Sequence, residues 1–423
     1  MNVLIIGGGG REHTLVWKIR QHPEVKQIYC IPGNGGIAAL AGCPALDAGD
    51  FPALASFVRE REIGFTVVGP EQPLVDGIVD YFEAEKLPIF GPNRSAARLE
   101  GSKIFSKQLM AKYDIPTAGF AEFDRVEAAL KYLSHLPEQP IVVKADGLAA
   151  GKGSIVCPDL NSAREAVDAL MRQKIFAAAG SKVVIEEFMT GEEVSIFAIT
   201  DGRDYLTLTP AQDFKRALDG DRGKNTGGMG SYAPTPFLTP QLREVALRTI
   251  VEPTFAALQS EGIDYRGVLY FGLMLTSGGP KVIEFNCRFG DPETQVVLPL
   301  LDSDLLEILQ AVHNRTLGKL RVELKPAYAA AVVLAAGGYP DAYEKGREIR
   351  GIPENRDDLL VFHAGTRRES GRLLTNGGRV MAVTALSEAS LQAATEKAYQ
   401  AVAQIHFDGM HFRRDIARRA WEG

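Results

Sequence analysis

Short apolar runs alternate with amphipathic stretches over the first hundred residues. Apolar runs typical of buried strands occupy residues 3–6, 26–31, 65–68 and 88–90. Apolar positions at helical spacing recur at residues 12–20, 51–61 and 74–85. This alternation predicts a parallel sheet covered on both faces, and ligands of such sheets bind where glycine-rich turns follow the strands.

The pattern changes after residue 102. A helix is predicted from Ser102 up to Pro116, then strands at 141–144, 154–157 and 182–188, with a helix near 162–172 that Ser162 would cap. Beyond Glu193 we expect longer strands, a polar loop at 219–230 and a helix at 240–261. The strands 267–275 and 280–286 meet at Ser277-Gly278-Gly279, which predicts a hairpin.

The last hundred residues form another predicted unit. Strands are expected at 329–335, 359–364 and 379–386, with Asn376-Gly377 as a hairpin turn. An amphipathic helix follows, with apolar positions at Leu391, Ala394, Ala398, Val402 and Ile405. The whole pattern predicts an α/β and α+β multidomain protein with parts at 1–103, 104–190, 191–325 and 326–423.

Composition narrows the class of protein. The 423 residues suffice for roughly two to four domains, and 45% hydrophobic with 24% charged residues is typical of a globular protein. A net charge of −6 without a basic stripe argues against nucleic-acid binding. Four cysteines without a Cys-x-x-Cys pair indicate reduced thiols rather than zinc. The longest apolar run, 327–336, is far short of the ~20 residues of a membrane span, so we expect a cytoplasmic protein with no membrane partner.

A strand at residues 281–286 carries the most informative polar residues. Glu284 and Asn286 are two apart, so they share one face of the strand and offer a carboxylate and an amide oxygen to one hard cation. Arg288 follows, a planar cation suited to phosphate or carboxylate. The segment indicates nucleotide-dependent chemistry, although an ordinary strand end with exposed polar residues has the same pattern.

A second strand, at residues 141–144, leads into a glycine-rich loop. Glycines let backbone N–H groups approach phosphate closely, and Lys144 supplies a charge at the strand end. The spacing of Gly147, Gly151-Lys152 and Gly153 does not fit a Walker A loop. A flexible hairpin is the alternative, which the apolar strand before Lys144 disfavours.

Two further segments suit a nucleotide or a phosphorylated sugar. The strand 185–188 could read a base through its backbone, and Glu193 could accept from ribose hydroxyls, although solvated acids at a strand end fit equally. The N-terminal glycines followed by Arg11 do not fit a dinucleotide site, because His13 replaces the third glycine. A monophosphate at the helix N-terminus fits better.

Polar glycine-rich loops complete the set. Residues 212–216 and 219–230 suit a flap that closes over substrates, or else a surface loop. His363 is expected to be a buried, hydrogen-bonded histidine rather than a catalyst.

In combination these segments resemble the phosphoribosylamine–glycine ligase family of ATP-grasp enzymes. The resemblance runs through nearly the whole chain, and the motifs that carry it are residues 8–13, 32–34, 68–71, 100–103, 144–153, 225–230, 284–295, 363–366, 375–380 and 414–417. It implies an N-terminal pre-ATP-grasp domain, two ATP-grasp subdomains with a glycine-rich lid and a metal site, and a small C-terminal α+β domain.

The resemblance implies that glycine, 5-phosphoribosylamine and ATP give glycinamide ribonucleotide, ADP and phosphate in purine biosynthesis. ATP would be held by Lys103, Lys144, Gly147, Gly151, Lys152, Gly153, Glu186, Glu187, Phe188 and Glu193. Glu284 and Asn286 would bind Mg²⁺ or Mn²⁺, and Arg288, Asp291 and Lys144 would act in catalysis. The substrates would be bound by Gly9, Gly10, Arg11, Asn34, Pro70, Glu71, Asp213, Lys215, Asn225, Thr226, Gly227, Gly228, Glu293 and Arg379.

Three positions depart from the family or superfamily pattern. Residues 271–274 carry no second metal-binding acid, Phe214 replaces a usual His, and Lys224 replaces a usual Pro. The last change is expected to loosen the loop and add charge near the substrates. Alternatives are another carboxylate–amine ligase on this scaffold, an NAD-dependent oxidoreductase and an ATP-binding module without turnover. The partners expected are small molecules, for a monomer or homodimer.

Overall fold

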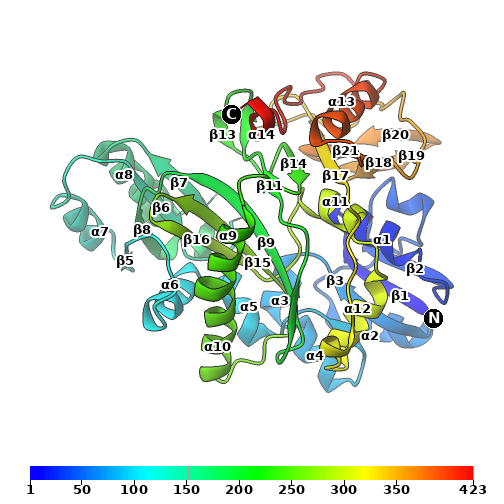
Figure 1. Ribbon diagram of the computed structural model, residues 1–423, viewed down its shortest axis with the longest axis horizontal. Coiled ribbons are helices and arrows are strands. Elements are labelled where there is room, and N and C mark those ends of the chain that lie inside the picture. The colour runs from blue at the N-terminus through cyan, green and yellow to red at the C-terminus, as the bar shows by residue number, and fades with distance from the viewer. Residues whose placement is uncertain (150–152, 423) are drawn as a thin grey trace.

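A parallel sheet built from the first ninety residues forms one side of the protein, whose computed structural model describes residues 1–149 and 153–422 (Figure 1). Its strands lie in the order β2-β1-β3-β4, all parallel. They are β1 (Asn2–Gly7), β2 (Gln27–Pro32), β3 (Ile63–Val68) and β4 (Ile89–Phe90). The helices of this part are α1 (Gly10–Ile19), α2 (Phe51–Glu60), α3 (Glu71–Asp76), α4 (Ile78–Ala84) and α5 (Arg94–Gly101), with a 3-10 turn at Ile37–Ala39. The parallel sheet predicted from sequence is confirmed.

The single helix predicted over residues 74–85 is wrong. The chain forms α3 and α4, which break at Gly77 with φ +92°. A side chain at this position would be strained, and its Cβ would lie 2.7 Å from Nε of Arg94. Apolar spacing continues across the break, so periodicity alone does not reveal it.

A four-stranded antiparallel sheet forms a separate lobe on the left of Figure 1. Its order is β5-β8-β6-β7, with β5 (Phe120–Phe123), β6 (Ile141–Ala145), β7 (Ser154–Cys157) and β8 (Val183–Glu187). The neighbouring helices are α6 (Lys103–Lys112), α7 (Val126–Leu133) and α8 (Leu160–Val167), the last continued by a π-helical turn at Asp168–Arg172, and a 3-10 turn spans Ala177–Ser181. Ser162 does not cap α8: the Asp159 carboxylate accepts from the Ser162 backbone N–H at 2.7 Å, so the helix begins earlier.

The central sheet is also antiparallel, in the order β10-β9-β15-β16. Its strands are β9 (Glu192–Thr200), β10 (Tyr205–Thr207), β15 (Gly267–Thr276) and β16 (Gly279–Asn286). The predicted hairpin of the last two is confirmed, as is a helical run made of α9 (Pro240–Ala246), a π-helical turn (Leu247–Val251) and α10 (Glu252–Ser260). The chain then forms α11 (Thr294–Val297), a 3-10 turn (Leu298–Leu300), α12 (Leu305–His313) and a 3-10 turn (Leu317–Lys319).

A five-stranded sheet joins the C-terminal part to the middle of the chain. Its order is β11-β14-β17-β21-β18, with β11 (Gln212–Asp213), β14 (Gly230–Ala233), β17 (Tyr328–Ala335), β18 (Leu359–His363) and β21 (Arg379–Ser387). The helix α13 (Leu391–Val402) packs on it, and α14 (Arg419–Glu422) follows. Strands on both sides of residue 325 therefore share one sheet, and the domain boundaries stay predictions.

Two small hairpins correct the predicted loops. Residues 222–225, expected in a polar loop, form β13 (Arg222–Asn225), which pairs with β12 (Arg216–Leu218). Asn376-Gly377 is not a hairpin turn, because it connects β20 (Arg372–Thr375) to β21 in a different sheet. The partner of β20 is β19 (Thr366–Glu369).

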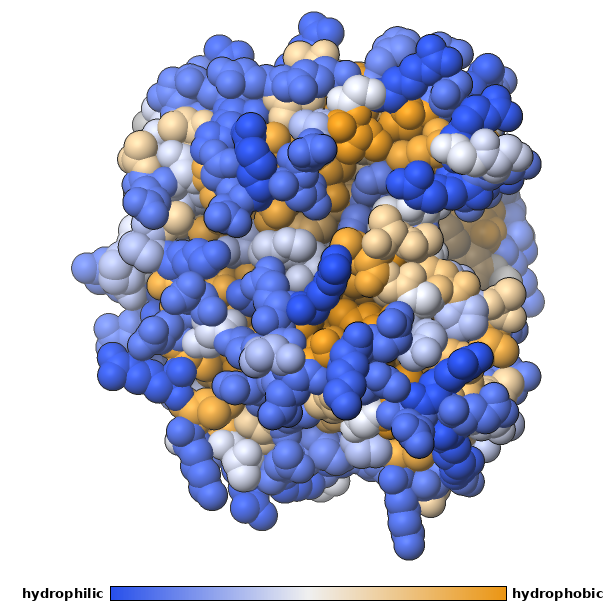
Figure 2. Space-filling model, turned by 90° about the vertical axis from the view of Figure 1, so that its right-hand side faces the viewer, coloured by the Kyte–Doolittle hydropathy of each residue, from blue (hydrophilic) through white to orange (hydrophobic). Residues whose placement is uncertain are grey.

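The surface is mostly polar. Figure 2 shows the face at the right of Figure 1, where hydrophilic residues cover most of the area and apolar ones gather mainly in recesses. Within residues 1–149 and 153–422, no helix is long and apolar enough to cross a membrane.

Candidate active site

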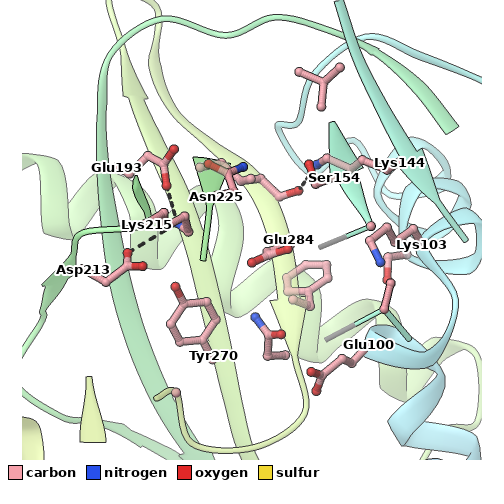
Figure 3. Close-up of a pocket in the computed structure, with 18 of the residues that line it drawn as sticks. Glu100, Lys103, Lys144, Ser154, Glu193, Asp213, Lys215, Asn225, Tyr270 and Glu284 are labelled. Carbon is pink, nitrogen blue, oxygen red and sulfur yellow. Dashed lines mark hydrogen bonds and ion pairs between the residues drawn. The ribbon is translucent and has the colours of Figure 1, made fainter. Parts of the chain in front are cut away.

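A cavity of about 390 Å³ lies between the central sheet and the left-hand sheet, and loops from the N- and C-terminal parts line it as well (Figure 3). Twenty of the predicted site residues line it: Arg11, Glu71, Lys103, Lys144, Gly153, Glu186, Glu187, Phe188, Glu193, Asp213, Lys215, Asn225, Thr226, Gly227, Glu284, Asn286, Arg288, Asp291, Glu293 and Arg379. Residues from every quarter of the chain thus meet at one place.

Six predicted residues do not line this cavity, namely Gly9, Gly10, Asn34, Pro70, Gly147 and Gly228. Gly151 and Lys152 lie outside the described residues. Gly147 is nevertheless adjacent, because Lys103 Nζ donates to its carbonyl at 3.4 Å.

The left-hand sheet presents a mixed face to the cavity. Glu186, Val142 and Val156 lie directly opposite one another on β8, β6 and β7. Since directly opposite residues point to the same side of a sheet, they form a row, all of which lines the cavity. Lys144, two residues after Val142, shares this face, and its Nζ lies 2.9 Å from Oε2 of Glu186. Phe188 and Met274 add apolar surface.

Glu284 and Asn286 line the cavity together from β16, as their spacing predicted. Burial would raise the pKa of Glu284, but Lys215, Lys144, Lys103 and Arg288 lower it below its usual value. Within the described residues no hydrogen bond to the Glu284 carboxylate is found, and Asn286 Oδ1 accepts only a long 3.3 Å bond from Arg288.

These oxygens fit a divalent cation. An ionised carboxylate without a hydrogen-bonding partner and an amide oxygen on one face are hard ligands, which leave further positions for phosphate oxygens and water. No group of three or more His, Cys, Asp or Glu side chains in the described parts of the chain makes a metal cage. A cation here would take few ligands from the described residues, and substrate oxygens and water would supply the others.

Arg288 is held by two carboxylates. Its Nε lies 3.1 Å from Oε2 of Glu71, and its Nη2 lies 2.9 Å from Oε1 of Glu100. Burial opposes ionisation of Glu71, yet Arg288 and Arg11 lower its pKa to about 2. Glu100 also accepts from the Cys287 backbone N–H at 2.7 Å. The planar guanidinium is therefore fixed at the edge of the cavity.

Asp213 and Lys215 point into the cavity from either side of Phe214. Lys215 Nζ lies 3.3 Å from Oδ1 of Asp213 and also pairs with Glu193 (Figure 3). Because alternate residues of an extended segment point in opposite directions, the Phe214 side chain lies in the C-terminal core instead. Glu193, expected near a ribose, is thus paired with a lysine in this structure.

Glu293 lies in the same charged region. Burial and the nearby carboxylate of Asp213 raise the pKa of Glu293 to about 7. Tyr270, whose hydroxyl accepts from Ser195 Oγ at 2.9 Å, also lines the cavity.

Arg379 ties the C-terminal part to the cavity. Its Nη1 donates to the carbonyl oxygens of Gly227 at 2.5 Å and Asp291 at 2.7 Å and lies 3.3 Å from the Asp291 carboxylate. Burial opposes ionisation of Asp291, but Arg379 and Arg11 keep its pKa below the usual value. The loop with Asn225, Thr226 and Gly227 is thereby fixed to the segment after β16.

The glycine turn before α1, where a phosphate was predicted, already carries two carboxylates. The backbone N–H of Gly9 donates to Glu12 at 2.6 Å, and that of Arg11 donates to Asp291 at 3.4 Å. Arg11 itself pairs with Glu12 and donates to the Phe289 carbonyl. Phosphate binding at this turn stays a prediction.

His363 behaves as the sequence predicted. Its backbone N–H donates to His13 Nδ1 at 2.7 Å, and its own Nδ1 lies 3.2 Å from Thr366 Oγ1. Burial lowers the pKa of His13 to about 3 and that of His363 to about 4, so both imidazoles are neutral near pH 7. Asn34 bridges the carbonyls of Gly8 and His363. These residues join the N- and C-terminal parts.

Lys224, which was expected to loosen its loop and to add charge near the substrates, lies away from the cavity. It ends in an ion pair with Asp341 at 2.8 Å, with its side chain 69% exposed, and it does not line the cavity. It also belongs to the paired strand β13 rather than to a loosened loop. The expectation of added charge beside the substrates is wrong.

Sequence reasoning missed Lys107, Glu100 and Tyr270, which all line the cavity. Lys107 and Glu100 lie on helices with ordinary mixed patterns, and Tyr270 lies in an apolar strand. Glu100 lies within the motif at residues 100–103, which was the one available signal, although the resemblance assigned it no role.

Comparison with known proteins gives a consistent result along the chain. Residues 1–100, 101–294 and 329–419 match the N domain, the ATP-grasp (A) domain and the C domain of phosphoribosylglycinamide synthetase. A phosphoribosylamine–glycine ligase of Caldanaerobacter subterraneus subsp. tengcongensis is 48% identical over 99% of this chain and 99% of its own length. That of Vibrio cholerae is 49% identical over 99% of this chain and 98% of its own length. The crystal structure of the Thermotoga maritima phosphoribosylamine–glycine ligase matches with a TM-score of 0.85 and 35% identity, over 98% of this chain and 100% of that one.

Proposed function

The chain belongs to the phosphoribosylglycinamide synthetase family, and from this premise we propose how its cavity joins glycine to 5-phosphoribosylamine with ATP. The products are glycinamide ribonucleotide, ADP and phosphate. One observation carries the mechanism: the Glu284 carboxylate, which accepts no hydrogen bond from the residues that the structure describes, lies among Lys215, Lys144, Lys103 and Arg288. It lines the same cavity as the apolar row of Val142 and Val156.

The chemistry requires activation of a carboxylate. Glycine's carboxylate is a poor electrophile, so one of its oxygens takes the γ-phosphoryl group of ATP, and the amine of the phosphosugar then displaces phosphate from the acyl carbon. Charge spreads over the phosphoryl oxygens as this group moves, and fixed cations stabilise it. Lys103, Lys144 and Arg288 lie around Glu284 and would supply these cations.

Different parts of the cavity suit different parts of the substrates. The row of Glu186, Val142 and Val156, with Phe188 nearby, provides an apolar platform and acceptors for the base. Arg288, locked by Glu71 and Glu100, suits the glycine carboxylate or the acyl phosphate. Asp213 and Glu293 provide carboxylates for the ammonium of glycine, and the loop held by Arg379 borders the phosphosugar.

The oxygens of Glu284 and Asn286 fit a divalent metal that would bind together with ATP. Glu284 and Asn286 would hold it, and when bound it supplies charge neutralisation at the phosphoryl oxygens. Mg²⁺ or Mn²⁺ would serve, since both accept carboxylate, amide and phosphate oxygens. A cytoplasmic monomer or homodimer that acts on small molecules is part of the proposal.

No protein nucleophile is assigned. Cys287, the cysteine beside the metal ligands, is buried, and burial together with Glu100 raises the pKa of its thiol well above the usual value. A thiol held neutral is a weak nucleophile, which agrees with direct phosphoryl transfer to the substrate.

Release of ADP tests the proposal. The assay contains Mg²⁺, ATP and glycine, with and without 5-phosphoribosylamine generated in place from ammonia and the pyrophosphate sugar. Release that requires both glycine and the phosphosugar is the expected result. ADP release with another acid or amine would support the mechanism but contradict the proposed substrates. No release with any pair of acid and amine would indicate an ATP-binding module without turnover.

A further inference from the structure

Lys107 is a buried lysine of the cavity that the mechanism above does not use. It lies on α6 with 2% of its surface exposed, and its Nζ lies 3.2 Å from Oε2 of Glu186. Lys144 contacts the same oxygen at 2.9 Å. Two lysines therefore share one carboxylate oxygen.

The other oxygen of this carboxylate has no partner. Glu186 is 2% exposed, and its Oε1 accepts no hydrogen bond in residues 1–149 and 153–422. A buried acceptor without a donor is costly, so such an atom in a cavity wall points to a donor on the ligand. Its neighbours across the sheet are Val142 and Val156, a flat apolar surface on which a purine ring can lie.

We propose that Lys107 is a positioning residue: it holds Glu186 charged and fixed, so that the free Oε1 selects a 6-aminopurine nucleotide. The proposal rests on the ATP-dependent function proposed above. The exocyclic amine of adenine donates to Oε1, whereas the 6-oxo group of hypoxanthine places an acceptor against a carboxylate, which is repulsive.

Lys107 suits this role because its surroundings are fixed. Lys144 Nζ is also held, by the Ile283 carbonyl at 3.0 Å, so the two lysines differ mainly in what else they face. Lys107 Nζ donates to Thr117 Oγ1 at 2.8 Å, and Thr117 in turn donates to the Val282 carbonyl at 2.7 Å on β16. The ammonium also lies 5.6 Å from the ring centre of Phe120. These partners belong to or adjoin two different sheets, so the lysine has little freedom.

Lys144, in contrast, is shared with the phosphate region. Glu284, beside which the phosphates are proposed to bind, is within its electrostatic reach. When phosphates attract Lys144, Glu186 loses one of its two cations, and a buried carboxylate without a cation is strongly unfavourable. Lys107 then remains as the counter-charge, and the selective oxygen keeps its place.

The test compares nucleotide binding by three variants of the full chain. Lys107→Met removes the charge at similar length, Lys107→Arg keeps it, and Lys112→Met is the control on the same helix, where Lys112 forms an exposed pair with Glu261. Equilibrium dissociation constants for ATP and inosine triphosphate are measured by calorimetry without glycine or phosphosugar. The same ratio is then taken from kcat/KM.

Wild type and Lys112→Met are expected to prefer ATP. Lys107→Met should reduce the preference about 10- to 100-fold, through weaker ATP binding with little change in kcat, because a charged hydrogen bond to the base is lost. Lys107→Arg should restore most of it. If Lys107 had a purely structural role, Lys107→Met would weaken the binding of both nucleotides equally. The ratio of their dissociation constants would then be unchanged.

An unchanged ratio in Lys107→Met, or no preference in wild type, would overturn the inference. If Lys107→Met does not fold, Thr117→Val replaces it, because it removes the hydroxyl to which Lys107 donates. This variant should also lower the preference for ATP over inosine triphosphate. An unchanged preference in Thr117→Val would overturn the inference as well. Binding is measured without turnover, so a protein that selects ATP but does not ligate glycine would contradict the proposed function alone.

Discussion

Glu284 is the residue on whose carboxylate turnover should depend most. It lies among four cations and is the one carboxylate on the β16 face that we assign to the metal. Glu284→Ala should lower kcat about 10²- to 10³-fold or more, because phosphoryl transfer loses its metal ligand. The measurement is ADP release across a Mg²⁺ titration, with the exposed Glu60→Gln as control. Near wild-type turnover in Glu284→Ala would show that the metal is held elsewhere.

The raised pKa of Glu293 should make the free energy of unfolding depend on pH. Its pKa rises from 4.5 to about 7 on folding, so between these values the folded chain binds more protons than the unfolded chain. The free energy of unfolding therefore falls as pH rises through this range. Glu293→Gln removes the effect and should be more stable than wild type at pH 8, on the order of 1–3 kcal/mol, but not at pH 4.

Urea unfolding at the two pH values, with EDTA present, measures this difference. Glu60→Gln on the exposed face of α2 is the matched control and should show no such trend. An equal effect of Glu293→Gln at both pH values would mean that this carboxyl is ionised with an ordinary pKa.

At the scale of single residues, the sequence could predict those that carry chemistry within a recognisable strand pattern. Glu284 and Asn286 are the clearest case, because spacing by two fixes them on one face. It could not predict that Lys107 and Glu186 would pair, since that contact joins a helix to a strand and depends on tertiary packing. Nor could it place the Phe214 side chain, which lies away from the cavity although both neighbours line it.

At the scale of elements, the hairpin of β12 and β13 is attached to the C-terminal segment through Arg413. This side chain is 1% exposed, pairs with Asp221 at 2.7 Å and Asp415 at 2.7 Å, and lies 4.8 Å from the ring centre of Phe214. Arg419 lies 4.9 Å from the same ring. The segment that carries Asp213, Lys215 and Asn225 is thereby fixed from outside the cavity.

Arg413→Met should lower the free energy of unfolding by about 2–4 kcal/mol and raise KM for glycine more than it lowers kcat. Removal of this buried cation leaves Asp415 without its ion-pair partner and leaves Asp221 with Arg419 alone. The hairpin then holds Asp213 and Lys215 less firmly. Thermal unfolding and steady-state kinetics measure both effects. Arg418→Met is the control, because Arg418 forms only an exposed pair with Glu422. Unchanged KM in Arg413→Met would show that the hairpin is held by β12 and β13 alone.

Strands and helices with strong periodicity were predictable, and their breaks were not. β1, β6, β16 and α13 follow their apolar patterns. The break at Gly77 and the strand β13 depend instead on a left-handed residue and on cross-strand pairing, neither of which changes the hydrophobic spacing. The Asp159 cap was overlooked because Ser162 offered an equally good capping residue.

At the scale of the whole molecule, the left-hand lobe should open independently of the rest. Its core consists of buried residues between Ala129 and Ile185 and is a separate cluster from those of the other sheets. Amide hydrogen exchange in β5, β6, β7 and β8 should therefore be faster than in β1 and β3, and ATP should slow it. Mass spectrometry of peptides from the two sheets measures this, with β18, which does not line the cavity, as an internal control. Equal exchange in both sheets would indicate that the molecule opens as one unit.

The order of parts along the chain could be predicted, since the N-terminal parallel sheet, the ATP-grasp part and the C-terminal part each have sequence motifs, and the family matches bear this out. The pairing of β14 with β17 could not be predicted from the sequence, because antiparallel partners about a hundred residues apart leave no local signal. That sheet, with Arg379, brings the C-terminal part to the cavity.

The fate of glycine's carboxylate oxygen tests the central claim most directly. Glycine labelled with oxygen-18 in both carboxylate oxygens is turned over with ATP and 5-phosphoribosylamine, and the released phosphate is analysed by mass spectrometry. Transfer through an acyl phosphate predicts one labelled oxygen in each phosphate, because the bridging oxygen leaves with phosphorus when the amine attacks. Unlabelled phosphate alongside glycinamide ribonucleotide would contradict the account.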